Sequence, residues 1–217
     1  MEKLKVGVLI SGRGSNLQAL INAGAEQDYP AEIVLVVSND ESAKGLEIAS
    51  SSGIPTKVID DRGYNTRQTF DAAVEEALSE ANVGLICMAG FMRLVSAWFA
   101  ERWRERILNI HPSLLPAFRG LSVHERVIES GVRFTGCTVH FVRPAVDEGP
   151  IIMQSVVPVF PNDTVEALAA RVLKAEHRIY PAALRMVAEG RVRISGDRVL
   201  IEGGQTHDKT LFNPSPD

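Results

Sequence analysis

The first hundred residues alternate between short apolar runs and segments with helical periodicity, and this alternation restricts the possible fold more than any other feature. The apolar runs are rich in Val and Ile and bounded by Gly, Asn or Asp, which predicts buried strands at 5–10, 32–38, 55–60 and 83–89. Helices are predicted between them near 15–27, 41–52 and 65–81, the last with Asn65 as its cap. Such alternation predicts an α/β fold: a single doubly wound, mostly parallel sheet with helices on both faces.

The second half of the chain continues with less regular spacing. A helix near 96–105, a strand at 107–110, a helix near 122–130 and strands at 135–142 and 151–159 are expected. Residues 163–189 read as a helix that is bent or broken at Pro181. The run VRISGDRVLIE predicts a hairpin with its turn at Ser195-Gly196-Asp197. Because no repeat or linker is visible, we expect one domain over residues 1–204 and a polar, flexible tail over 205–217.

Composition narrows the class of protein. The chain has 217 residues, 45% hydrophobic and 23% charged, as in ordinary soluble globular proteins. A net charge of -4 provides no basic field for a phosphate backbone, so nucleic acid is not an expected partner. No signal-peptide layout and no apolar run of about 18 residues is found, so no membrane association is expected. Cys87 and Cys137 lie in apolar runs, which predicts reduced core thiols and a cytoplasmic location. We expect no metal, because no Cys or His residues have the spacing of metal ligands.

A glycine-containing loop, ISGRGSN at 10–16, lies between the first strand and the first helix. Its two glycines allow a sharp turn, and Ser15 and Asn16 open the helix, where free backbone N–H groups favour an anion. The dinucleotide fingerprint would need glycine where Leu17 stands, and the Gly-Lys-Ser/Thr of a Walker loop is absent. The loop therefore predicts a phosphate cradle, with a tight turn that only caps the helix as the alternative.

Three polar side chains form a candidate catalytic set. The run LNIHPSLLPAFRG at 108–120 places Asn109 and His111 on alternate positions, and VDEGP at 146–150 offers Asp147. For acyl transfer to an amine, a side-chain amide can donate to the developing oxyanion, and an imidazole can donate to it or move protons. A neighbouring carboxylate would favour the charged imidazole. Each residue also has an ordinary interpretation: a backbone cap, a hydrogen-bonded strand end and a turn residue.

The remaining histidines are weaker candidates. His140 lies on a predicted strand that could flank the site, whereas His124, His177 and His207 are expected on helix surfaces or in the tail.

Several segments, taken in order, make a pattern more specific than any one of them. They are ISGRGSNLQAL, AGFMRLVS at 89–96, LNIHPSLLPAFRG, TGCTVHFV and VDEGPIIMQ, between residue 5 and Gly190. As a set they resemble the phosphoribosylglycinamide formyltransferase family, also called glycinamide ribonucleotide transformylases. The resemblance implies a Rossmann-like formyltransferase fold and transfer of a formyl group from 10-formyltetrahydrofolate, as co-substrate, to the amine of glycinamide ribonucleotide in de novo purine synthesis. It implies no metal.

The resemblance also implies roles for individual residues. Asn109, His111 and Asp147 would be catalytic, with Asp147 raising the pKa of His111. The ribonucleotide phosphate would lie on Gly14, Ser15 and Asn16, and its ribose would contact Glu176 in KAEHRIYP. The folate pocket would be formed by Arg67, Met92, Arg93, Leu94, Val95, His140, Arg143, Pro144, Ala145 and Val146. Two departures lie near the loop over the substrate: family members often have a basic residue where Ala117 stands and His where Ser122 stands.

Other functions remain open on the same residues. Methionyl-tRNA formyltransferase uses similar groups but carries a basic C-terminal RNA-binding domain, which we do not expect here because the chain is acidic and ends soon after residue 200. Formyltetrahydrofolate deformylase transfers the formyl group to water and usually has an N-terminal regulatory domain, whereas the first strand here starts at residue 5. A non-catalytic nucleotide- or folate-binding protein could share the fold, but it would not require the Asn, His and Asp together. We expect small-molecule partners and a monomer or homodimer.

Overall fold

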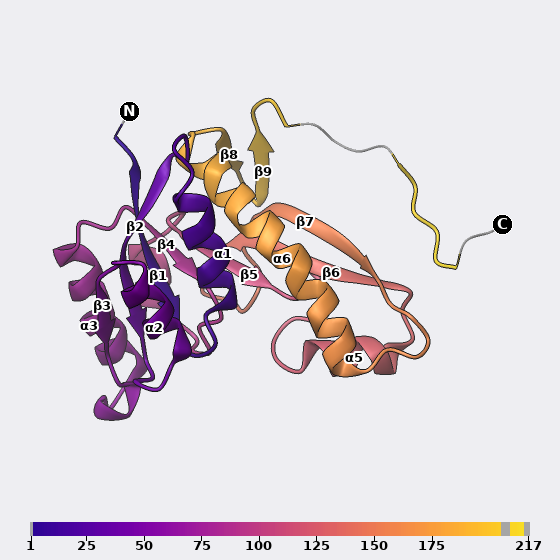
Figure 1. The fold of residues 1–217 in the computed structure, drawn as a ribbon, viewed down its shortest axis with the longest axis horizontal. Helices are drawn as coiled ribbons and strands as arrows, with labels where there is room; N and C mark the ends of the chain where they lie inside the picture. Colours follow the sequence, from indigo (N-terminus) through magenta and orange to yellow (C-terminus); the bar gives the residue numbers. More distant parts are fainter. Residues whose placement is uncertain (1, 205–208, 215–217) are drawn as a thin grey trace.

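A seven-stranded sheet forms the centre of the molecule (Figure 1). The computed structural model describes residues 2–204 and 209–214. The strands lie in the order β3 (Thr56–Val58), β2 (Ala31–Ser38), β1 (Leu4–Ile10), β4 (Leu85–Met88), β5 (Ile107–His111), β6 (Phe134–Phe141), β7 (Ile151–Pro158). The first five are parallel, and β6 is antiparallel to both of its neighbours. The predicted doubly wound, mostly parallel sheet is confirmed.

Helices cover both faces of this sheet, and each face has its own apolar core. Their bounds are α1 (Ser15–Gly24), α2 (Lys44–Ser51), α3 (Arg67–Glu80), α4 (Ala97–Arg102), α5 (Val123–Ser130) and α6 (Val165–Ala188), with a short 3-10 turn η1 (Asp61–Gly63). Residues of α1, α2, α5 and α6 pack on one face, where α1 and α6 lie side by side (Figure 1). Residues of α3 and α4 pack on the other face.

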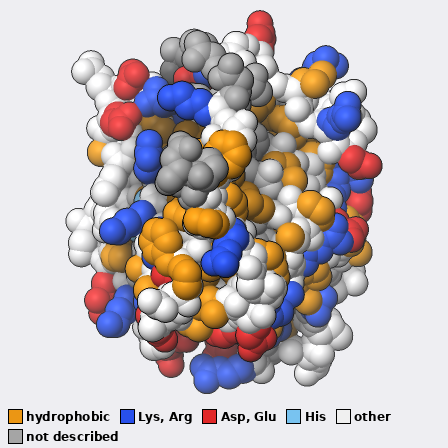
Figure 2. Space-filling view, turned by 90° about the vertical axis from the view of Figure 1, so that its right-hand side faces the viewer, with side chains coloured by type: hydrophobic (Ala, Val, Ile, Leu, Met, Phe, Trp, Pro, Cys, Tyr) orange, Lys and Arg blue, Asp and Glu red, His pale blue; other side chains and the backbone are white. Residues whose placement is uncertain are grey.

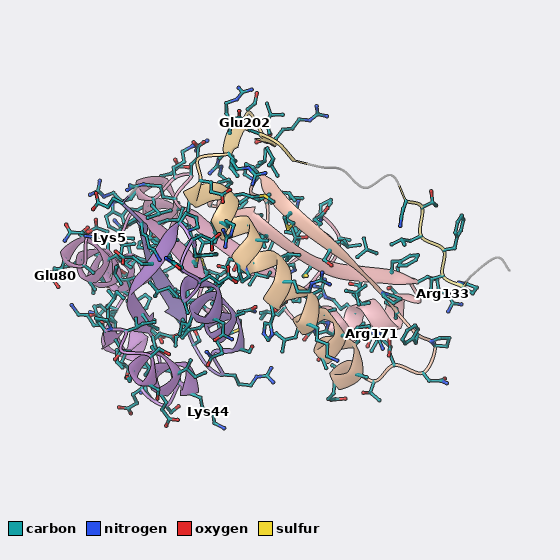
Figure 3. All side chains as sticks on the ribbon, turned by 45° about the horizontal axis from the view of Figure 1, so that its top comes forward. Lys5, Lys44, Glu80, Arg133, Arg171 and Glu202 are labelled. Carbon is teal, nitrogen blue, oxygen red and sulfur yellow. The ribbon has the colours of Figure 1, made fainter. Side chains whose placement is uncertain are left out.

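The parallel half of the sheet fixes where ligands can approach. Figure 3 labels Lys5 near the amino end of β1 and Lys44 at the start of α2, at opposite ends of this half. The loops that leave the carboxyl ends of β1, β2 and β4 lie at the Lys44 end, where ligands bind in open α/β sheets.

Two local predictions differ from the structure. The cap of α3 is Thr66, not Asn65: the Thr66 hydroxyl accepts from the Thr69 N–H at 3.2 Å, and the Thr69 hydroxyl accepts from the Thr66 N–H at 3.3 Å. This reciprocal pair satisfies two otherwise free N–H groups, which Asn65 does not reach. The prediction that Pro181 could break the helix is also wrong, because α6 continues through this proline and is 24 residues long. The buried Tyr180 next to it donates to the Met88 carbonyl at 3.0 Å, so tertiary contacts hold the helix across the proline.

The C-terminal part forms a small hairpin beside the main sheet. Strands β8 (Val192–Ser195) and β9 (Arg198–Ile201) pair through a two-residue loop whose Gly196 has φ 62°, as predicted for this turn. Of the predicted tail, residues 205–208 and 215–217 lie outside the described residues. Within 209–214, the Asn213 side chain donates to the Arg133 and Val159 carbonyls at 2.6 and 3.1 Å. Figure 3 labels Arg133 at the far end of the antiparallel half, near Arg171 of α6.

Exposed hydrophobic side chains gather on the face beside β7. Figure 2 shows the face toward which β6, β7 and the C-terminal segment turn in Figure 1, and hydrophobic side chains gather across its centre. Val156 of the edge strand β7 and Phe160 just beyond it are among the exposed hydrophobic residues. Among residues 2–204 and 209–214, none of the helices has the length and apolar character that crossing a bilayer requires.

Candidate active site

Strand β5 presents two of the predicted catalytic residues on the same face. Alternate residues of a strand point to the same side, so Asn109 and His111 share a face with Ile107, which belongs to the core under α3 and α4. The connection from β5 to β6 runs through α5 on the opposite face. The face over Asn109 and His111 is therefore left free of a covering helix.

The loop between β6 and β7 brings the third residue to this face. The Asp147 Oδ2 atom lies 3.4 Å from His111 Nδ1, and its Oδ1 atom lies 3.8 Å from His140 Nε2. All three side chains are nearly buried, so their electrostatic interaction is weakly screened. Residues that are 36 positions apart in the chain, His111 and Asp147, thus form a direct contact.

His140 stands directly opposite Asn109 in the β5–β6 ladder. Its Nδ1 atom lies 2.9 Å from the Phe141 carbonyl oxygen, which can only accept, so Nδ1 carries the hydrogen. Burial of the ring, which is 2% exposed, lowers the pKa of His140 and favours the neutral imidazole. Its Nε2 lone pair then accepts from Asn109 Nδ2 at 3.2 Å, and this contact sets the orientation of the Asn109 amide.

The loop after β5 closes on the same residues. His111 Nε2 donates to the Phe118 carbonyl at 3.0 Å, and the Gly120 N–H donates to Asp147 Oδ2 at 2.9 Å. Phe118 and Asp147 both have a φ of 54°, a left-handed conformation that non-glycine residues rarely adopt, which is frequent at functional loops. The two ring nitrogens of His111 thus face oxygen atoms of Asp147 and of the Phe118 backbone.

A cavity of about 990 Å³ opens beside this cluster. It is lined by the three predicted catalytic residues and by every residue assigned to folate binding: Arg67, Met92, Arg93, Leu94, Val95, His140, Arg143, Pro144, Ala145 and Val146. Sequence reasoning missed Phe91 and the segment Gly120–Glu125, which also line it. His124 was expected on a helix surface but contributes to this lining, because α5 begins at the cavity edge. Only the amphipathic start of α5 could have indicated this.

The residues assigned to the ribonucleotide form a second group outside that lining. Gly14 caps α1 with φ 75°, and a Cβ atom there would lie 2.5 Å from the Gly45 Cα atom, so only glycine fits. Asn16 Nδ2 donates to Glu176 Oε2 at 2.8 Å, and within residues 2–204 and 209–214 the buried Asn16 Oδ1 atom has no hydrogen-bond partner. Burial raises the pKa of Glu176. Gly14, Ser15 and Asn16 thus lie together at the start of α1, and Glu176 joins them from α6.

Two further chemical features bear on the site. Within the described part of the chain, no group of three or more His, Cys, Asp or Glu side chains has the arrangement of a metal site. Cys87 and Cys137 are buried and unpaired, as predicted for reduced thiols.

Most of the chain matches one family model. Residues 4–184 match the family model described as formyl transferase. The chain belongs to this family.

Two relatives match over nearly the full length of both chains. The chain is 41% identical over 199 residues to the phosphoribosylglycinamide formyltransferase of Haemophilus influenzae, covering 92% of this chain and 94% of that protein. The crystal structure of glycinamide ribonucleotide transformylase 1 from Symbiobacterium toebii superposes with a TM-score of 0.90 at 50% identity, covering 92% and 94% of the two chains. The resemblance to phosphoribosylglycinamide formyltransferases that the motifs predicted is confirmed.

Two other matches support less, one because it covers a small part of the other protein and one because its sequence identity is low. The trifunctional purine biosynthetic protein adenosine-3 of Gallus gallus is 56% identical over 192 residues, but the chain spans only 19% of its length. A formyltetrahydrofolate deformylase from Pseudomonas syringae shares the fold with a TM-score of 0.86 at 23% identity.

Proposed function

We propose that this chain transfers a formyl group from 10-formyltetrahydrofolate to the amine of glycinamide ribonucleotide, a step of de novo purine synthesis. The contact of Asp147 with His111, beside Asn109 and at the wall of a large cavity, carries this proposal. A protein that only binds nucleotide or folate has no need for this buried polar cluster, whose partners must be held close together.

The reaction makes three demands on the site. The substrate amine attacks the formyl carbon, a C–N bond forms, and the carbonyl oxygen gains negative charge. Asn109 Nδ2 can donate to that oxygen, a role worth about 2.7–4 kcal/mol in other enzymes. His111, held against Asp147, supplies a second donor. The bond to the folate nitrogen then breaks, and the proton lost by the amine passes to that nitrogen through Asp147 and His111.

The imidazole must change partners to act in this way. His111 Nε2 is hydrogen-bonded to the Phe118 carbonyl, so a substrate oxygen takes the place of that carbonyl when the loop shifts. Phe118 lies in a strained left-handed conformation, which lowers the cost of such a shift.

The cavity is suited to the folate donor. Its volume of about 990 Å³ is at the upper end for small-molecule sites. Apolar side chains of Met92, Leu94 and Val95 offer contact to aromatic rings, and Arg67 and Arg143 offer charge to carboxylates. The deformylase alternative would use the same cavity with water as acceptor, and only the fold likeness at 23% identity favours it.

The ribonucleotide is assigned to the second group of residues. Free N–H groups at the start of α1, following Gly14, favour its phosphate. Glu176 would accept from ribose hydroxyls, and Asn16 Oδ1, which has no hydrogen-bond partner among the described residues, would be a further acceptor.

The proposal includes the setting of the reaction. Residues 1–204 act as one formyltransferase domain in the cytoplasm, as a monomer or homodimer, on small molecules and without a metal, nucleic acid or membrane.

An acceptor-dependence assay tests the proposal. Consumption of 10-formyltetrahydrofolate is measured with and without glycinamide ribonucleotide, and formylated ribonucleotide is quantified by mass spectrometry. Consumption that requires the ribonucleotide is expected. Consumption at the same rate without it would make the protein a deformylase, and no consumption in either case would make it a binding protein.

A further inference from the structure

A closed ring of polar contacts connects the glycine loop to the loop at 89–96. The Met92 N–H donates to Ser11 Oγ at 2.8 Å, and Ser11 Oγ donates to Asn39 Oδ1 at 2.5 Å. Asn39 Nδ2 donates to Asp61 Oδ1 at 2.9 Å, and Asp61 Oδ2 lies 2.9 Å from Arg93 Nη1. Because Arg93 follows Met92 in the chain, the contacts return to the loop where they began.

The sheet itself brings these residues together. Ser11 and Asn39 are the first residues after β1 and β2, whose last residues Ile10 and Ser38 are paired in the ladder. Asp61 begins η1 just after β3, the next strand in the sheet, and β4 leads into the loop that carries Arg93. The ring therefore runs along the carboxyl ends of four adjacent parallel strands.

The loop that the ring holds contributes six consecutive residues, 90–95, to the cavity lining. Its Met92 and Leu94 are 69% and 53% exposed, so apolar burial does little to fix their positions. The loop is anchored by the buried Phe91, which stacks on Phe70, and by the Ser11 N–H, which donates to the Gly90 carbonyl at 3.1 Å. Side chains hold it at three further points. Ser11 accepts from the Met92 N–H, the ion pair with Asp61 holds the Arg93 side chain over the Phe70 ring, and Asp71 Oδ2 accepts from the Ser96 N–H at 2.6 Å.

We infer that the Ser11–Asn39–Asp61–Arg93 ring positions the 90–95 loop for the folate donor, with Asp61 as a positioning residue and Arg93 as the anchor of the loop. The inference rests on the proposed function in taking the donor as the occupant of the cavity. It gives Arg93 a different task from direct binding of a ligand carboxylate, because Asp61 already faces its guanidinium.

The neighbouring residue Asp60 provides a matched control. Asp60 pairs with the exposed Arg62 at 2.7 Å and accepts from the Arg62 N–H, and all the side-chain hydrogen bonds that it makes in the described part of the chain are to Arg62. Asp60→Asn and Asp61→Asn remove the same charge from adjacent positions. Asn39→Ala breaks the ring at a second point, and Asp61→Glu restores the carboxylate.

The test measures donor binding and kinetics separately. Affinity for 10-formyl-5,8-dideazafolate, a stable analogue of the donor, is measured by calorimetry, and kcat and both KM values are measured by steady-state kinetics. Asp61→Asn and Asn39→Ala should weaken analogue binding and raise the donor KM about three- to tenfold, the range for a partly buried ion pair. The ribonucleotide KM and kcat should stay within about twofold, Asp60→Asn should match the wild type, and Asp61→Glu should fall between the wild type and Asp61→Asn.

Several outcomes overturn the inference. Asp61→Asn could bind the analogue as tightly as Asp60→Asn, or it could raise both KM values equally, which would indicate a general structural role. A wild type that binds the analogue but transfers no formyl group refutes the proposed function, while the binding comparison still decides on the ring. A wild type that binds no analogue refutes both.

Discussion

The parallel and antiparallel halves of the sheet contribute different parts of the site. In the parallel half, strands β1 to β4 end in loops that carry the Ser11–Asn39–Asp61–Arg93 ring and the glycine loop. In the antiparallel half, β6 places His140 opposite Asn109, and the following loop carries Asp147 back to His111. Because the strand direction reverses between β5 and β6, groups from the loops that follow β5 and β6 meet over one short stretch of the sheet.

This difference separates binding from chemistry. The parallel half presents backbone N–H groups and apolar loop residues, which recognise ligands without titrating. In the proposed reaction, His111 at the end of β5 and Asp147 from the loop after β6 would move protons, and residues 143–146 of that loop also line the cavity. Substitutions in the two halves should therefore change different kinetic parameters.

His111→Ala should have the largest effect because it removes the group between Asp147 and the reacting carbonyl. We expect kcat to fall about 10²-fold or more, while the affinity for glycinamide ribonucleotide stays within about twofold. Single-turnover rates and calorimetry with the ribonucleotide measure the two quantities. An unchanged kcat would show that His111 has no catalytic role.

Asp147→Asn separates charge from structure at the same contact. The amide oxygen can still accept from the Gly120 N–H, so the loop should keep its place, but the negative charge that faces His111 and His140 is lost. We expect kcat to fall about 10- to 100-fold with both KM values nearly unchanged. A shift in the donor KM without a change in kcat would instead make Asp147 part of the binding half.

Glu176→Gln tests the binding half through pH. Burial raises the pKa of Glu176, so the folded chain keeps a proton there at pH values where the unfolded chain has lost it. The free energy of unfolding attributable to this group therefore falls as pH rises from its unfolded pKa of about 4.3 through the raised folded value. Gln removes this contribution and can still accept from Asn16 Nδ2.

Chemical denaturation at a series of pH values measures this difference. The variant should lack the part of the decline that Glu176 causes, and it should bind glycinamide ribonucleotide more weakly because the charged acceptor is lost. Identical pH profiles for the two proteins would show that ionisation of Glu176 is not linked to folding.

Much of this arrangement could be predicted from the sequence, for identifiable reasons. Short Val- and Ile-rich runs predict buried strands well, and β1, β2 and β5 lie within one residue of their expected bounds. The alternation of Asn109 and His111 placed them on one face because the strand period is two. The contact of Asp147 with His111 rested on the family resemblance, since no pattern in the chain fixes where a loop of non-repetitive conformation will lead.

What the sequence did not predict depends on tertiary contacts. The Ser11–Asn39–Asp61–Arg93 ring joins four separate segments, and each residue alone reads as a loop residue or a surface charge. The unbroken α6 also depends on tertiary contacts, because the packing of Tyr180 and its neighbours outweighs the local tendency of Pro181 to break a helix. The cap was wrongly predicted at Asn65 because Asn65 and Thr66 are adjacent and both are residue types that cap helices.

The cap of α3 gives the prediction with the smallest expected effect, and it concerns the parallel half of the sheet. Thr66→Ala removes the hydroxyl that accepts from the Thr69 N–H at the start of α3, and should lower the free energy of unfolding by about 1 kcal/mol. Asn65→Ala should leave it within about 0.5 kcal/mol, because Asn65 does not cap the helix. In both variants kcat should stay within about twofold of the wild type, since the hydrogen bonds and ion pairs of His111 and Asp147 are made with residues outside α3. Urea denaturation and steady-state rates measure both quantities, and a kcat that falls with stability in Thr66→Ala would show that the parallel half also controls the chemical step.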